Sequence, residues 1–148
     1  MKTNLLIGSC VLWAALTVMA CGGATKSNSG EEAAVRETVQ HYLNGLKYND
    51  VESLKRAFYP EAKLFFVKRD QLGQLTQEQW YKGFAATAGQ EEKGDLQIAA
   101  VDITGNAASV KVVEVYEKSK YTDYLSLLRF AGGWKIVNKI YVAEPIKN

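Results

Sequence analysis

The chain has 148 residues, and its 18 lysine and arginine residues nearly balance 16 acidic residues, for a formal net charge of +2. Acidic and basic side chains are interspersed without a basic stripe, which makes a nucleic acid a poor candidate partner. One histidine and two cysteines are too few for a zinc-type ligand set, and no glycine-rich phosphate loop is present, so we expect no metal and no other cofactor.

The first twenty residues have the pattern of a secretory leader. Lys2 is followed by an uncharged, largely apolar run that ends in small residues, and such a segment is removed from the mature protein. The run is shorter than the roughly 20 apolar residues that a transmembrane helix needs. The order aliphatic, any, small, cysteine at residues 18–21 resembles the lipobox of bacterial lipoproteins. This resemblance implies that Cys21 becomes the lipid-modified first residue of the mature chain.

Lipidation at Cys21 would place the protein in the bacterial cell envelope, anchored to a membrane and facing the periplasm or the cell surface. Cys10 lies inside the expected leader, so a mature chain would keep one thiol, which suits acylation better than a disulfide. The alternative is an ordinary signal peptide with a chance cysteine. Residues 21–30 are rich in Gly, Ser, Thr and Asn, so we expect them to form a flexible tether, followed by one domain at residues 31–148.

The first half of the domain has helical patterns. Apolar residues at three- and four-residue spacing, together with end signals, predict helices over residues 31–49, 51–59 and 77–88. The third helix is opened by a capping box at Thr76–Gln79, and it carries Trp80 and Phe84 on one face.

The remainder of the domain reads as strands. Those expected lie at residues 63–67, 96–104, 107–117, 121–130 and 134–142. Tight turns join the last ones into an antiparallel meander. Helices followed by strands in one core predict an α+β domain, with about three N-terminal helices packed in a curved antiparallel sheet.

The last hairpin has two partly apolar faces. With a three-residue turn at 131–133, Ser126 lies opposite Asn138. Their face also carries Tyr124, Leu128, Phe130, Trp134, Ile136 and Ile140. The other face carries Leu125, Leu127 and Val137. Because a half-buried antiparallel sheet normally has one polar face, we expect the first face to line a pocket and the second to meet a homodimer partner. A third layer of the same chain is the alternative for the second face.

Two polar pairs stand out on this hairpin. Ser126 and Asn138 either hydrogen-bond to each other or orient a ligand in a mainly apolar pocket. Asp123 lies diagonal to Lys139 on the second face, where we interpret an ion pair as register or interface chemistry rather than catalysis. The candidate ligand-binding residues are Tyr42, Phe66, Trp80, Phe84, Tyr124, Ser126 and Asn138.

Several stretches of the sequence resemble a known superfamily. Residues 38–50 and 58–62 resemble the opening of nuclear transport factor 2-like (NTF2-like) domains, a group that includes ketosteroid isomerases, polyketide cyclases and scytalone dehydratase. Residues 121–128 and 133–141 are similar to the branch called putative lumazine-binding proteins. The resemblance covers roughly residues 31–142. It implies a cone-shaped domain, in which helices close a curved sheet over a pocket, and which is commonly dimeric through the sheet.

Carrying the isomerase residues over to this chain leaves an incomplete catalytic set. The resemblance implies that their oxyanion-donating tyrosine falls at Tyr42, their general base at or near Phe66, and their second oxyanion donor at Ser126. A phenyl ring cannot accept a proton, and proton abstraction beside a carbonyl needs a base within hydrogen-bond reach. We therefore expect a binding site without catalytic residues.

Two other groups remain as candidate bases. His41 is adjacent to Tyr42 on the helix and therefore points about 100° away from it. Glu114 faces the pocket if the strand alternation places it with Ser126, whereas a two-residue turn at 119–120 places it on the outer face.

The favoured function is binding of a small apolar or aromatic molecule without catalysis, by a membrane-anchored envelope lipoprotein that dimerises through its sheet. The first alternative is a small enzyme of the isomerase, cyclase or dehydratase type that uses Tyr42 with Glu114 or His41. The second is a dimeric interaction module whose pocket is filled by its own side chains.

Overall fold

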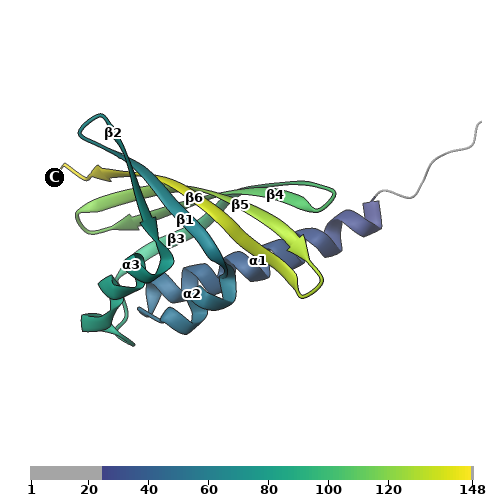
Figure 1. Ribbon diagram of the computed structural model, residues 1–148, viewed down its shortest axis with the longest axis horizontal. Coiled ribbons are helices and arrows are strands. Elements are labelled where there is room, and N and C mark those ends of the chain that lie inside the picture. The colour runs from purple at the N-terminus through teal and green to yellow at the C-terminus, as the bar shows by residue number, and fades with distance from the viewer. Residues whose placement is uncertain (1–24, 148) are drawn as a thin grey trace, which may run out of the picture.

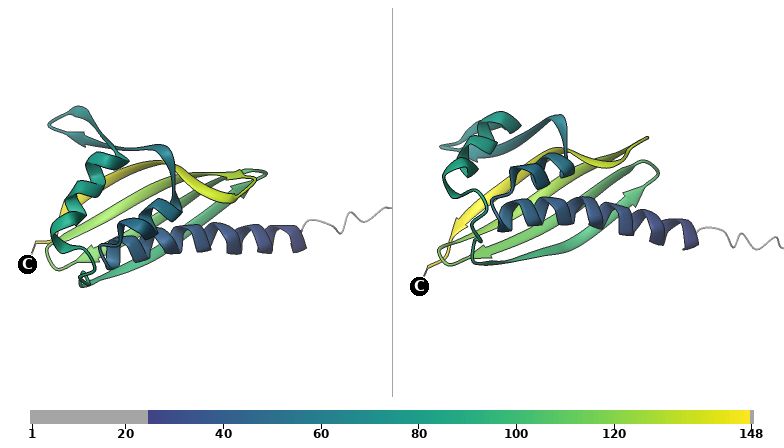
Figure 2. Two further views of the ribbon diagram at one scale, coloured as in Figure 1. Left: turned by 60° about the horizontal axis from the view of Figure 1, so that its bottom comes forward. Right: turned by 90° about the horizontal axis from the view of Figure 1, so that it is seen from below.

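The structure is a computed structural model of the chain, and it describes residues 25–147. The expected leader at residues 1–20 and the expected lipidation site at Cys21 lie outside the described residues. The longest helix, α1 (Thr25–Lys47), packs against one face of a curved sheet, as Figures 1 and 2 show. This helix begins before Glu31, so residues 25–30 of the expected tether are helical.

The other helical segments lie toward one end of the sheet (Figure 1). They are α2 (Val51–Ala57), α3 (Gln77–Tyr81) and the 3-10 helix η1 (Lys82–Thr87). The predicted capping box is confirmed, because the Thr76 hydroxyl accepts from the Gln79 N–H and the Gln79 side chain accepts from the Thr76 N–H. α3 and η1 together take the place of the single third helix that the sequence predicted.

The described strands form one six-stranded sheet in the order β2-β1-β6-β5-β4-β3. Their bounds are β1 (Phe58–Lys68), β2 (Gln71–Thr76), β3 (Gly94–Thr104), β4 (Ala107–Tyr116), β5 (Ser119–Phe130) and β6 (Gly133–Pro145). The β3–β6 meander is antiparallel as predicted, but β1 pairs parallel with β6. The predicted α+β cone is therefore confirmed, with a mixed sheet in place of an antiparallel one.

The β1–β2 hairpin is the part of the sheet that the sequence analysis did not predict in full. Its turn residues Arg69 and Asp70 have φ angles of 53° and 62°, the left-handed pair that a two-residue hairpin turn requires. β1 also begins earlier than expected. Pro60 is tolerated within it because the pairing with β6 is interrupted between Phe58 and Lys63, where no ladder hydrogen bond is lost.

The buried face of the sheet is the one that carries Leu125 and Leu127, each 1% exposed. These residues belong to one core with α1, whose members include Val35, Val39, Tyr42, Val110, Val112 and Ile136. The opposite face exposes Tyr124 (50%) and Ile140 (48%). The predicted assignment of the two faces was therefore wrong: the face expected to meet a dimer partner covers α1, and the face expected to line a pocket is the outer one.

A β-bulge in β6 puts Trp134 and Ile136 on the buried face, although the sequence analysis expected them on the other face. β5 pairs with β6 as Leu127↔Ile136 and then as Ser126↔Asn138, so Val137 has no partner. An extra residue resets the alternation of side chains, so Ile136 and Lys139 are both buried although they are three positions apart. The predicted pairing of Ser126 with Asn138 is confirmed, but both lie on the outer face with Tyr124.

Candidate active site

The Tyr42 hydroxyl is the centre of a buried polar cluster. Tyr42 lies on α1 and is 0% exposed. Its oxygen is 2.9 Å from Glu114 Oε1 on β4 and 2.6 Å from Lys139 Nζ on β6, and it also hydrogen-bonds to Asp123 Oδ2 on β5. Three neighbouring strands therefore each bring one ionisable side chain to the same phenol.

Lys139 and Asp123 form an ion pair within this cluster, with 2.7 Å between Nζ and Oδ2. The predicted pair is thus confirmed, but it is buried on the inner face, because the Asp123 residue is 0% exposed and Lys139 is 5% exposed. The second carboxylate oxygen, Asp123 Oδ1, has no hydrogen-bond partner among the described residues. Removing either partner of such a buried pair would leave the other charge without a counter-ion and would strongly destabilise the fold.

Aromatic rings surround the Lys139 ammonium group. Nζ lies 5.0 Å from the ring centroid of Tyr42, 5.5 Å from that of Trp80 and 4.9 Å from that of Tyr141. Rings at this distance attract a cation through their negative faces. The three rings therefore favour a positive charge at Nζ and limit the access of water to it.

Glu114 is the member of the cluster that is able to exchange a proton near neutral pH. Burial is the main cause that raises its pKa, to about 8, although the positive charge of Lys139 acts in the opposite direction. Burial and the nearby Asp123 and Glu114 charges also hold the pKa of Tyr42 well above its ordinary value. At pH 7, the cluster therefore contains a neutral phenol and a largely protonated Glu114.

These protonation states give every hydrogen bond at the phenol a donor. One phenol proton cannot serve two carboxyl groups. With the Tyr42 hydroxyl donating to Asp123, a protonated Glu114 and the Lys139 ammonium both donate to the Tyr42 oxygen. The Tyr116 hydroxyl donates to the other Glu114 oxygen at 3.3 Å.

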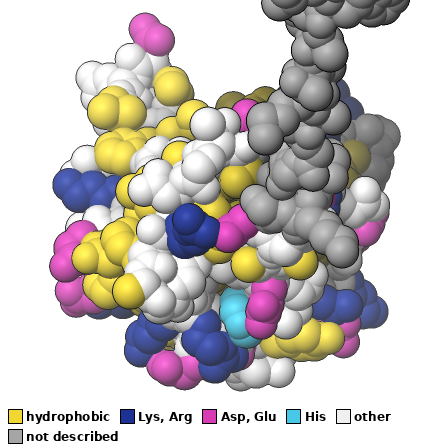
Figure 3. Space-filling view, turned by 90° about the vertical axis from the view of Figure 1, so that its right-hand side faces the viewer, with side chains coloured by type: hydrophobic (Ala, Val, Ile, Leu, Met, Phe, Trp, Pro, Cys, Tyr) yellow, Lys and Arg dark blue, Asp and Glu magenta, His cyan; other side chains and the backbone are white. Residues whose placement is uncertain are grey.

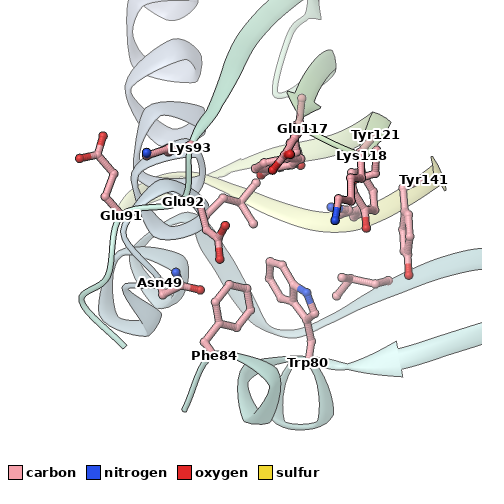
Figure 4. A pocket seen from close by; sticks show the side chains of 16 residues that line it. Asn49, Trp80, Phe84, Glu91, Glu92, Lys93, Glu117, Lys118, Tyr121 and Tyr141 are labelled. Carbon is pink, nitrogen blue, oxygen red and sulfur yellow. Dashed lines mark hydrogen bonds between the residues drawn. The ribbon is translucent and has the colours of Figure 1, made fainter. Parts of the chain in front are cut away.

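A cavity of about 780 Å³, the main cavity, opens beside the cluster. Glu114 and Lys139 line it, whereas Tyr42 and Asp123 lie behind them. In Figure 4, Trp80 and Phe84 rise from α3 and η1, and Tyr121 and Tyr141 face them from the sheet. The remaining lining residues are Leu46, Asn49, Leu64, Glu91, Glu92, Lys93, Tyr116, Glu117, Lys118 and Ser119. The wall thus combines aromatic rings with charged side chains, with an acid and an amine at its inner end and the other charged residues at its mouth.

A family model described as putative lumazine-binding matches residues 30–142 of the chain. The chain belongs to this family. The match agrees with the predicted superfamily and includes every residue of the polar cluster.

Individual proteins that this family member resembles are distant in sequence. An NTF2-like protein of unknown function from Shewanella baltica OS155 is 28% identical, with a TM-score of 0.72 over 80% of this chain and 97% of that chain. A protein from Shewanella frigidimarina NCIMB 400, described as a putative ketosteroid isomerase, is 16% identical, with a TM-score of 0.57 over 76% and 98% of the two chains. A curated relative, aldolase FrzH from a Cladobotryum species, is 24% identical over 79% of this chain and 94% of its own length.

The predicted ligand-binding residues fall into separate groups in this member of the putative lumazine-binding family. Trp80 and Phe84 line the main cavity. Phe66 does not line the cavity but packs against a ring that does, with 5.3 Å between the ring centroids of Phe66 and Tyr141. Tyr42 is the centre of the cluster. The other three residues, Tyr124, Ser126 and Asn138, lie on the outer face of the sheet.

The two candidate bases of the sequence analysis lie at different places. Glu114 is 3% exposed and faces the main cavity, because its strand alternation matches that of Leu125, which faces inward. His41 instead lines a second cavity of about 290 Å³ beside Arg56 and Lys135. Figure 3 shows the molecule's single histidine on this face, next to acidic and basic side chains. His41 is therefore not part of the Tyr42 cluster.

Asp123 and Lys139 are the functional candidates that the sequence analysis placed on the wrong face. A signal for them exists, because each is an ionisable residue that shares a strand face with Leu125 and Leu127. Within residues 25–147, no group of three His, Cys, Asp or Glu side chains could hold a metal ion. No helix in that range is both long enough and apolar enough to span a membrane.

Proposed function

We propose that this protein binds a small aromatic or largely apolar carbonyl compound in the main cavity and moves a proton on it with Glu114. The observation that carries the proposal is the position of Glu114: it is nearly fully buried, yet it lines the cavity and contacts the phenol of Tyr42. A general acid–base group works best when its pKa lies near the working pH. The pKa of about 8 puts Glu114 in that range.

The neighbours of Glu114 suit chemistry beside a carbonyl group. Removing a proton from the carbon next to a carbonyl places negative charge on the carbonyl oxygen, and fixed positive charge or hydrogen-bond donors stabilise it. Lys139 provides positive charge at the same end of the cavity. Tyr42 holds Lys139 and Glu114 at one oxygen atom and so fixes their relative positions.

The sequence-based preference for binding without catalysis rested on the absence of an ionisable group beside Tyr42. That premise was wrong, because two carboxyl groups contact the phenol. Binding without turnover remains the second candidate function, supported by the description of the family as lumazine-binding. A module with a filled pocket is not supported, because a cavity of about 780 Å³ is larger than a ring system.

Exchange of carbonyl α-hydrogens in D₂O tests the proposal without knowledge of the natural substrate. The full chain is incubated with a panel of cyclic and aryl ketones, and loss of the α-proton signal is followed by NMR. We expect exchange to be accelerated for at least one ketone, and the Glu114→Gln variant to lose about 10²-fold or more of that rate. The control is Glu144→Gln, at an exposed position on β6.

Two outcomes would contradict the proposal. In the first, ketones from the panel bind, as measured by changes in Trp fluorescence, but none exchanges faster than in buffer, which favours binding without turnover. In the second, exchange occurs at equal rates in the wild type and in Glu114→Gln.

We further propose that the protein is anchored in the bacterial cell envelope through an acylated Cys21. The sequence pattern at residues 18–21 supports this proposal. More than one acyl chain is needed for stable anchoring, because one chain binds a membrane only marginally. Growth with labelled palmitate should label the wild type and not the Cys21→Ala variant. Label that persists in Cys21→Ala would exclude Cys21 as the site.

We propose that the outer face of the sheet forms a homodimer interface. Tyr124, Ile140 and Val142 are each about half exposed there, and large exposed apolar patches usually meet a partner. Ile140→Asp should convert a dimer to a monomer in sedimentation velocity. The control is Leu72→Asp, because Leu72 is 75% exposed but lies on the projecting β1–β2 hairpin (Figure 1). A wild type that sediments as a monomer would refute the interface.

A further inference from the structure

Lys139 differs from an ordinary lysine in a buried ion pair, because it lies between the main cavity and the residues that bind its amine. Lys139 and Glu114 line the cavity, and they are the groups that a bound molecule meets. The two oxygen atoms that bind Nζ belong to Tyr42 and Asp123, which do not line the cavity. The amine therefore faces the ligand with its proton acceptors behind it.

We propose that Lys139 is a covalent catalytic residue that forms a Schiff base with the aldehyde or ketone group of the substrate. This inference rests on the proposed function above, because it assigns a carbonyl substrate to the same cavity. It adds a covalent step and makes Lys139 the nucleophile, so that an iminium group takes the place of the carbonyl as the acceptor of electrons.

Nucleophilic attack requires that Nζ first loses a proton, and the structure provides an acceptor. Asp123 Oδ2 is 2.7 Å from Nζ. The other oxygen of that carboxylate, Oδ1, has no partner among the described residues and so has a free site for a proton. Transfer from Nζ to Asp123 leaves a neutral amine beside a neutral carboxylic acid, with no change in the total charge of the pair.

The atoms of the covalent step balance with the groups present. Nζ attacks the carbonyl carbon and forms a C–N bond, while the carbonyl oxygen takes the Glu114 proton and becomes a hydroxyl. Nζ of the resulting carbinolamine still carries two protons, and it gives one of them to the Glu114 carboxylate, which passes it on to the hydroxyl. The hydroxyl leaves as water when the C=N bond forms, and Asp123 keeps the proton that it took from Nζ. Glu114 is then a carboxylate beside the iminium and can accept the α-proton. Hydrolysis reverses these steps and restores Lys139.

The surroundings of Nζ suit the intermediate as well as the free amine. An iminium group carries the same positive charge as an ammonium group, so the rings of Tyr42, Trp80 and Tyr141 attract both. The Asp123 carboxylate pairs with the ammonium group, and the Glu114 carboxylate provides the negative charge beside the iminium. The aromatic wall also limits access of water, which would otherwise hydrolyse the Schiff base before proton transfer.

Reductive trapping tests this inference directly. The full chain is incubated with 2-naphthaldehyde and sodium cyanoborohydride, which reduces a Schiff base to a stable secondary amine, and the modified lysines are located by peptide mass spectrometry. Lys118 is the internal comparison, because it lines the same cavity but is exposed at its mouth. We expect Lys139 to be modified about tenfold or more faster than Lys118, since nearby groups assist formation of the Schiff base.

Two variants separate covalent chemistry from a structural role. Lys139→Arg keeps the positive charge beside Asp123 and cannot form a Schiff base, so it should fold, lose the fast label and lose ketone exchange. The matched control is Lys63→Arg at an exposed position on β1, which should keep the fast label at Lys139 and the exchange.

Each outcome separates this inference from the proposed function. If Lys139 is labelled no faster than Lys118, Lys139 is not a Schiff-base residue. The same conclusion follows if Lys139→Arg exchanges ketone protons at the wild-type rate, and in that case the proton-transfer function of Glu114 still stands. Fast labelling of Lys139 together with unimpaired exchange in Glu114→Gln would instead refute the role of Glu114 and keep that of Lys139.

Discussion

Lys139 and Asp123 form an ion pair across β5 and β6, with 2.7 Å between Nζ and Oδ2 and no more than 6% of either side chain exposed. Each of the two charges is neutralised mainly by the other in a site with little water. The stability of the protein and the chemistry of its main cavity therefore depend on the same pair.

Removing one member of this pair should destabilise the fold strongly. The Asp123→Asn variant leaves the Lys139 charge buried without a counter-ion, and breaking such a pair costs about 3–5 kcal/mol in the free energy of unfolding. Replacing both residues, as in Asp123→Leu with Lys139→Met, should cost less than Asp123→Asn alone. Urea unfolding at neutral pH measures both changes.

Asp102→Asn is the control for this comparison, because Asp102 is exposed on β3. It should change stability by less than about 0.5 kcal/mol. A similarly small effect of Asp123→Asn would show that Lys139 finds another partner or reaches water, contrary to its burial.

Loss of the Tyr42 hydroxyl should raise the pKa of Glu114. When Glu114 is ionised, the Tyr42 hydroxyl donates to its carboxylate, and this hydrogen bond is one of the causes that lower the Glu114 pKa. Its removal in Tyr42→Phe therefore shifts the titration upward. The variant should also lose about 1–3 kcal/mol of stability, because buried polar groups lose a partner. Titration of the Glu114 carboxyl by ¹³C NMR and urea unfolding measure these effects.

Tyr81→Phe provides the matched control for that titration. The Tyr81 hydroxyl donates to Gln77 Oε1 at 2.5 Å and belongs to a different hydrogen-bond group. The Glu114 pKa should be unchanged in this variant. A lower Glu114 pKa in Tyr42→Phe would mean that the phenol does not stabilise the Glu114 carboxylate.

Stability should fall as the pH rises from about 4.5 toward 8, with Glu114 as the cause. In this window the folded state holds a proton on Glu114 that the unfolded state has lost, because the folded pKa of about 8 exceeds the ordinary value of 4.5. One such proton contributes a slope of at most about 1.4 kcal/mol per pH unit. Glu114→Gln mimics the protonated form and should lose this contribution. Equal pH slopes for the two proteins in urea unfolding would contradict it.

The bulge residue Val137 should not be needed to direct Lys139 inward. Without Val137, the pairs Leu127↔Ile136, Ser126↔Asn138 and Leu125↔Lys139 become consecutive, so regular alternation leaves Lys139 on the buried face. We expect the Val137 deletion variant to keep the ion pair with Asp123 and the ketone exchange, as Val137→Ala should. Loss of exchange in the deletion variant but not in Val137→Ala would show that the bulge itself positions Lys139.

Local signals in the sequence predicted local structure well. The capping box at Thr76 requires only the residues of one helical turn, so its pattern could be recognised without knowledge of the fold. The pairing of Ser126 with Asn138 was also correct, but the predicted three-residue turn at 131–133 was wrong. Phe130 pairs with Gly133, and the extra residue Val137 makes up for the shorter turn.

The face of the sheet could not be predicted in the same way. A bulge at Val137 and a turn at Glu117–Lys118 depend on how β4, β5 and β6 pack together, and nothing in the sequence near them marks either one. Because alternation has a period of two, one unrecognised extra residue moved Trp134 and Ile136 from the predicted face of Ser126 to the buried face of Leu125 and Leu127. The grouping of Tyr42 with Glu114 likewise needed contacts between residues 72 positions apart.

The protonation of Glu114 is the property on which this account depends most directly. A ¹³C-carboxyl NMR titration of the folded protein, with the resonance assigned by comparison with Glu114→Gln, measures it. We expect a midpoint near pH 8, because burial and the nearby Asp123 raise the Glu114 pKa. A midpoint near the ordinary value of 4.5 would mean that Glu114 is a permanent carboxylate at neutral pH, and it would contradict the proposed acid–base role.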